Sequence, residues 1–115
     1  MISATFIFKQ KKSDSEFETL DRSIESFVEN HPEYLGKDSW VNIEKGTMAV
    51  VYYFQSHKGL EALKTFSDHK TAKSQYTKWY EGYQVVIAEV THCYGDGNIE
   101  HVTNSEFRNP NGTNF

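Results

Sequence analysis

The chain has 115 residues, of which 37% are hydrophobic and 15% aromatic, and its formal net charge is −4 at pH 7. This length suits one domain, which would bury roughly 65% of the surface that its unfolded chain exposes. Acidic and basic residues are interleaved, with KQKK at 9–12 as the only short basic run. Nucleic acid is therefore excluded as an expected partner, because no basic stripe could neutralise phosphates.

Alternating apolar residues predict the strands. Ile2, Ala4 and Phe6 share one parity, and MAVVYYF at 48–54 is apolar on both parities. KGT at 45–47 is a short connection containing glycine, so the strands on either side of it should pair antiparallel. We expect strands at 2–9, 37–44, 48–54 and 83–93.

Helical spacing predicts two further segments. Phe17 and Leu20 begin an apolar face that follows Ser13 or Asp14, either of which can cap a helix. The second helical region starts after residue 56, breaks near 67–68, and continues through several aromatic residues to Gly82, which is expected to end it. We expect helices at 15–30 and 56–82.

This order of elements predicts an α+β fold, the ferredoxin-like βαββαβ plait, with a four-stranded antiparallel sheet and helices on one face. The last two strands are apolar on both sides, as Tyr52 and Tyr53 illustrate. Because helices can cover one face only, the other should meet a second copy in a two-fold homodimer. Burying on the order of 600 Å² per subunit would contribute about 15 kcal/mol before the costs of association.

The composition changes near residue 94. The stretch GDGNIEHVTNSEFRNPNGTNF is rich in Asn and Gly, which predicts a domain at 1–94 and a polar, flexible tail at 95–115. Ile99, Val102 and Phe107 leave open the alternative that part of this tail docks on a neighbour.

Compartment and metal chemistry can also be addressed from the sequence. A single cysteine, Cys93, cannot form an internal disulfide, which fits a reducing compartment and predicts a cytoplasmic protein. MISATFIFKQ is too short and too β-like for a signal peptide, and no run approaches the roughly 18 apolar residues of a membrane span. No histidine pair has the spacing of zinc ligands, so we expect no metal and no cofactor.

Several stretches together resemble a known family. They are ISATFIFK at the start, YLGKDSW, VVYYFQSHKGLEAL, and SDHKTAKSQYTKWYEGYQVVIAEV. The chain resembles the antibiotic biosynthesis monooxygenase-like proteins of the dimeric α+β barrel superfamily, and in particular their small uncharacterised bacterial members. The resemblance covers about residues 1–94 and implies a ferredoxin-like subunit that dimerises through its sheet.

The resemblance also implies a chemistry, which is cofactor-independent oxygenation of a small aromatic compound in a pocket between helices and sheet. His69 stands where many members carry a histidine, and it would act as base or polar anchor. Trp40, Asn42, Tyr52 and Tyr76 would form the wall of the pocket.

Other roles remain open for the same residues. His69 could bond only to backbone or to Asp68, Trp40 could be an interface residue, and Tyr76 with Trp79 and Tyr80 could be a helical core stripe. The main alternative function is a non-catalytic small-ligand-binding or stress-related dimer. Haem binding or degradation is less favoured, because the first strand ends without the Asn of the haem-degrading members.

Overall fold

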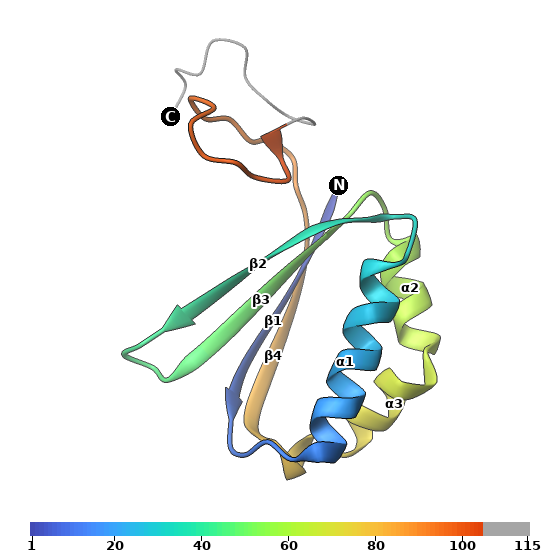
Figure 1. The fold of residues 1–115 in the computed structure, drawn as a ribbon. Coiled ribbons are helices and arrows are strands. Elements are labelled where there is room, and N and C mark those ends of the chain that lie inside the picture. Colours follow the sequence, from blue (N-terminus) through green and yellow to red (C-terminus); the bar gives the residue numbers. More distant parts are fainter. Residues whose placement is uncertain (105–115) are drawn as a thin grey trace.

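A four-stranded antiparallel sheet carries all the helices on one face in the computed structural model, which describes residues 1–104 (Figure 1). The strand order is β2-β3-β1-β4, which is the ferredoxin-like arrangement expected from the sequence. In chain order the elements are β1 (Ile2–Gln10), α1 (Ser15–Glu29), β2 (Tyr34–Asn42), β3 (Thr47–Phe54), α2 (Lys58–Thr65), α3 (Ser67–Ser74), the short 3₁₀ helix η1 (Tyr76–Lys78) and β4 (Tyr80–Glu89).

The first helix begins as its sequence predicts. Asp14 is the N-cap, and its Oδ1 accepts the backbone N–H of Phe17 at 2.8 Å. This bond holds the pKa of the Asp14 carboxyl below its usual value. The predicted end at residue 30 differs from the observed Glu29 by one position, which is within the fraying of a helix terminus.

The second helical region differs from the prediction. The helix does not continue to Gly82, because α3 ends at Ser74 and β4 already begins at Tyr80. The cause is contact between residues that are far apart in the sequence. Gln10 pairs with Tyr80 across the sheet, and the carbonyl of Trp79 accepts the N–H of Lys11 at 2.7 Å. Strand pairing therefore replaces the helix that the spacing of the aromatic residues predicts.

The strand β2 also differs from the prediction. It runs from Tyr34 to Asn42, whereas the expected segment was 37–44. An irregularity in the pairing with β3 lies between Tyr34 and Gly36, so the strand begins before the expected segment and includes Gly36. The hairpin to β3 instead turns at 43–46, where Gly46 has φ of +65°.

The core lies between the helices and one face of the sheet, and it has two parts. The aliphatic part contains Ile2, Ala4, Val28, Phe54 and Leu60. Trp79, which is 1% exposed, anchors the aromatic part at the other end of β1. Cross-strand partners share a face, so Ala4, Tyr52 and Ile87 all face the helices, whereas Val51 and Val86 face away.

A segment after β4 contacts the helix-free face near the start of β2. Nε2 of His101 lies 2.6 Å from Oδ2 of Asp38, and the His101 ring packs edge-on against Tyr53. Val102 lies against Gly36, where an added Cβ would come within 3.3 Å of its side chain. The domain boundary expected near residue 94 stays a prediction, and Phe107 lies outside the described residues.

Candidate functional site

The five residues singled out from the sequence lie in two places. Tyr52 pairs with Ala4 and so lies on the helix-facing side of the sheet. Trp40 pairs with Ala49 on the opposite face, and Asn42 shares that parity. One chain therefore does not bring Trp40 and Asn42 together with Tyr52.

The side chains on β2 have surroundings of their own. Trp40 is 62% exposed on the helix-free face. The Oδ1 atom of Asn42 accepts the backbone N–H of Lys45 at 3.1 Å, which stabilises the hairpin turn. Their predicted roles in ligand binding stay predictions, and within a single subunit Asn42 has a structural role.

Tyr76 belongs to a connected group of rings beneath the helices. We call this group the aromatic cluster. Each ring has a neighbour in the group whose centroid is at most 6.0 Å away. The rings come from β1, α1 and the segment that runs from η1 into β4. The cluster comprises Phe6, Phe8, Phe17, Tyr76, Trp79, Tyr80 and Tyr83.

Trp79 fixes the corner of this cluster. Its indole Nε1–H donates to Oδ1 of Asp14 at 3.1 Å, the same oxygen that caps α1. Its ring contacts Phe17, with centroids 5.6 Å apart. Trp79 is therefore a structural member of the cluster, which agrees with a core role for part of the aromatic stripe.

The cluster is open along β4. Tyr83, Val85 and Ile87 share the helix-facing parity, yet they are 40%, 48% and 47% exposed. Apolar and aromatic surface on the helix side of β4 is thus left accessible to a small molecule. A hollow beside Phe8, of about 350 Å³, opens mainly on the opposite face of the sheet, because Ile7, Lys9 and Gln84 in its lining share the parity of Val86, so it does not open onto the cluster.

Two phenols on this side of the sheet stand out electrostatically. Burial raises the pKa of Tyr52 to about 12, with a further contribution from the Asp21 carboxylate. The same two causes raise the pKa of Tyr80 to about 12. The raised pKa keeps both phenols protonated, and within residues 1–104 neither hydroxyl has a hydrogen-bond partner.

Asp21 and Tyr80 were not singled out from the sequence. Asp21 is exposed by more than a third, yet the surrounding protein raises the pKa of its carboxyl. Tyr80 was interpreted as part of a helical stripe, although it lies on β4. One indication of this position was present in the sequence. Asp21 follows Phe17 by four residues, which puts the two side chains on the same face of a helix.

His69 is half-buried on α3. Burial lowers its pKa, with a further contribution from Lys73, so the ring is neutral near pH 7 and can accept a proton. Its neighbour Asp68 is turned toward α1, where it accepts a hydrogen bond from Ser23 at 2.5 Å. Among the described residues, His69 has no hydrogen bond or ring contact with the other four candidates.

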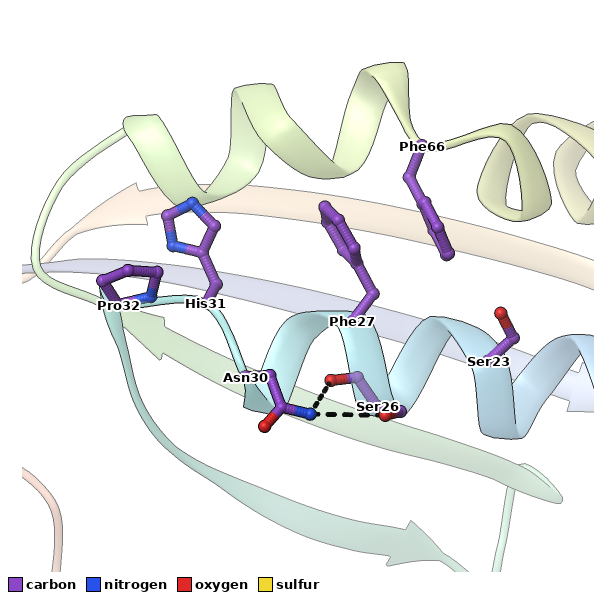
Figure 2. A pocket seen from close by; sticks show the side chains of 7 residues that line it. All are labelled: Ser23, Ser26, Phe27, Asn30, His31, Pro32 and Phe66. Atoms are coloured by element: carbon purple, nitrogen blue, oxygen red, sulfur yellow. Dashed lines mark hydrogen bonds between the residues drawn. The ribbon is translucent and has the colours of Figure 1, made fainter.

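A second hollow lies between α1 and the α2–α3 junction (Figure 2). Its volume is about 430 Å³, and neither it nor the hollow beside Phe8 is lined by His69. It is lined by Ser23, Ser26, Phe27, Asn30, His31, Pro32 and Phe66. Within residues 1–104, no group of three or more His, Cys, Asp or Glu side chains could hold a metal ion.

No helix in the described part of the chain has both the length and the apolar character needed to cross a bilayer.

Comparison with known proteins identifies the fold. No protein-family profile and no curated protein sequence matches the chain. Solved structures do match. Rv0793 from Mycobacterium tuberculosis superposes with a TM-score of 0.64 at 10% identity, covering 80% of this chain and 96% of the other.

Two further structures carry functional descriptions. SnoaB, a cofactor-independent oxygenase from Streptomyces nogalater, matches with a TM-score of 0.62 at 9% identity, covering 80% of this chain and 94% of its own. A structure described as an antibiotic biosynthesis monooxygenase matches with a TM-score of 0.58 at 13% identity, covering 79% and 99%. The chain therefore has the ferredoxin-like fold of the antibiotic biosynthesis monooxygenase-type structures that its sequence resembles.

Proposed function

We propose that this chain is a monooxygenase-like protein that binds a small aromatic compound on the aromatic cluster and oxygenates it without a cofactor. The observation that carries the proposal is the aromatic cluster itself, whose helix-facing surface stays half-open along β4 and includes the unpartnered phenol of Tyr80. The phenol of Tyr52 lies on the same side of the sheet, on β3, where it packs against the aliphatic core. Rings stack well on such a surface, and the protonated phenols can donate hydrogen bonds to the oxygens of a phenol or quinone.

The reaction needs no group that the chain lacks. A base removes a proton from an activated ring carbon or phenolic hydroxyl, and the resulting carbanion reacts with O₂. One oxygen atom becomes a ring carbonyl, and the other leaves as water with two hydrogens of the substrate, both from the CH₂ group of an anthrone, or one from the ring carbon and one from the hydroxyl of a phenol. His69 is the candidate base, because its lowered pKa keeps it neutral. Tyr76 contacts Tyr83 at 4.9 Å and belongs to the wall.

A homodimer through the helix-free face is part of this proposal. Trp40 and Val86 expose 62% and 46% of their surface there, and Val51 and Ala49 lie between them in the sheet. A second copy would cover these apolar side chains, with Trp40 and Asn42 at the seam. The cytoplasmic location predicted from Cys93 remains a prediction.

Oxygen consumption with an anthrone probe tests the proposed activity. We expect one O₂ consumed per anthrone, and a rate lowered by about 100-fold in His69→Phe. His57→Phe is the matched control, since His57 is exposed at the start of α2 and makes no side-chain cap bond.

Two results would argue against the proposal. Saturable binding of anthrone without oxygen uptake would favour the non-catalytic ligand-binding alternative. Equal rates in His69→Phe and His57→Phe would remove His69 from the reaction.

A further inference from the structure

The groove between α1 and the α2–α3 junction has an oriented hydrogen-bond donor in addition to its volume. The groove lies along the outer side of the helix pair, with the strands behind it (Figure 2). Its volume of about 430 Å³ falls in the range of small-molecule sites. None of its lining residues belongs to the aromatic cluster.

His31 supplies an oriented donor at one end of this groove. Its Nδ1 accepts the backbone N–H of Glu33 at 3.0 Å, so the proton of the neutral ring is on Nε2. Within the described residues, Nε2 has no partner, and Figure 2 shows the ring directed toward α2 across the groove. A ligand in the groove would therefore meet a fixed N–H donor.

The amide of Asn30, the preceding lining residue, is held by α1 itself. Its Nδ2 donates to the carbonyl of Ser26 at 2.7 Å and lies 3.3 Å from the Ser26 hydroxyl. These bonds fix the amide, and its Oδ1 has no partner within residues 1–104. Figure 2 shows this oxygen directed away from the His31 ring, so the two groups do not converge on one ligand.

Two phenylalanines form the apolar middle of the groove. Phe27 from α1 and Phe66 from the junction stack with centroids 4.1 Å apart and planes 8° from parallel. Phe66 has an extended backbone between two helices, which lets its ring reach α1. Their exposed edges and outer faces offer a surface for another flat ring.

Charge distinguishes between neutral and anionic ligands. Asp68 accepts the bond from Ser23 at the far end, and Glu33 follows His31 at the near end. Within residues 1–104, no lysine or arginine lines the groove. A carboxylate would be repelled there, whereas an uncharged amide would not.

We propose that this groove is a second ligand site, separate from the aromatic cluster, for small, flat, uncharged aromatic compounds that carry a hydrogen-bond acceptor. The carbonyl of a primary carboxamide accepts from Nε2 of His31, and its ring lies against the Phe27–Phe66 pair. This proposal does not depend on the oxygenase proposal.

Benzamide titration of the ¹⁵N-labelled full chain tests the proposal. We expect saturable amide shifts at 26–32 and around Phe66, with a dissociation constant below about 10 mM. Benzoate and cyclohexanecarboxamide are the matched probes. The first adds a negative charge and the second removes the flat ring, and each should bind at least about fivefold more weakly.

Two substitutions test the role of the His31 donor by itself. His31→Phe keeps a ring but removes Nε2–H and should weaken benzamide binding about fivefold, whereas His57→Phe should leave it unchanged. Shifts that appear only near Tyr52 and Tyr80, no saturable shifts up to about 10 mM, or equal affinities of His31→Phe and wild type would each overturn the proposal. The wild-type shift map decides the question even if His31→Phe folds poorly.

Discussion

At the scale of single residues, one carboxylate oxygen and one indole join three elements. Oδ1 of Asp14 caps α1 and accepts Nε1–H of Trp79, whose carbonyl in turn accepts the N–H of Lys11. The end of β1, the start of α1 and the start of β4 are thus held at one corner. The aromatic cluster depends on this corner for the position of Phe17 and Tyr80.

Trp79→Phe tests this arrangement. The substitution keeps an aromatic ring but loses the hydrogen bond to Asp14 and part of the buried surface. We expect the free energy of unfolding to fall by about 1–3 kcal/mol in urea titrations followed by circular dichroism. The control is His57→Phe, whose side chain is exposed at the start of α2, and an equal loss in both variants would contradict the role of Trp79.

Tyr52 and Tyr80 make a second prediction at this scale, about alkaline pH. Both side chains have a folded-state pKa of about 12 against a usual value of 10. The folded state therefore favours the neutral phenols, and their contribution to stability is complete below pH 10 and is lost as the pH rises toward 12.

The double variant Tyr52→Phe/Tyr80→Phe lacks both phenols. Between pH 9 and about pH 11, its free energy of unfolding should fall less than that of wild type. Denaturant titrations at each pH measure this, and ultraviolet absorbance of tyrosinate should show two fewer late-titrating phenols in the variant. A parallel loss of stability in both proteins over this range would contradict the assignment.

At the scale of elements, α2 approaches the sheet closely enough to require a glycine. An added Cβ at Gly59 would lie 2.4 Å from Cδ1 of Phe54, which is itself only 1% exposed. In an unconstrained helix, Gly→Ala stabilises by about 1 kcal/mol. Here the clash with a fully packed ring outweighs that gain.

Gly59→Ala should therefore lower the melting temperature, with a net loss of about 1–3 kcal/mol as α2 is displaced from Phe54. Gly95→Ala is the control, since an added Cβ there meets nothing within 4 Å. Differential scanning calorimetry of both variants is the measurement. A Gly59→Ala protein as stable as wild type would show that the helix sits farther from the sheet.

The elements also show what the sequence could predict. Short-range patterns were sufficient for β1, α1 and β3, whose bounds fall within one residue of the prediction. They were insufficient for β4. The spacing of Tyr76, Trp79 and Tyr80 is helical, but pairing of Tyr80 with Gln10 and the Trp79–Lys11 bond are long-range contacts that no local pattern contains.

The candidate site was predictable only in part, for the same reason. The alternation of side chains along a strand predicts that Trp40 and Asn42 share one face and that Tyr52 and Tyr53 lie on opposite faces, and the structure agrees. Which of these faces carries the helices depends on packing between elements. The contribution of Asp21 to the Tyr52 and Tyr80 environments required α1 and the sheet to be placed relative to one another.

At the scale of the whole molecule, the sheet presents apolar side chains on the face that has no helices. Trp40 and Val86 are exposed at opposite sides of this face, and His101 and Val102 occupy only its end near Asp38 and Gly36. A monomer would leave this surface in water, which soluble proteins seldom do over large contiguous areas. We therefore propose that a second copy of the chain covers it.

Sedimentation equilibrium at micromolar concentration tests this requirement most directly, on wild type and on Val86→Asp. Val86 faces away from the helices, so a charge there should leave the subunit folded by circular dichroism while it disrupts an apolar interface. We predict twice the chain mass for wild type and the mass of one chain for Val86→Asp. A wild-type chain that sediments as a stable monomer would contradict the proposed homodimer.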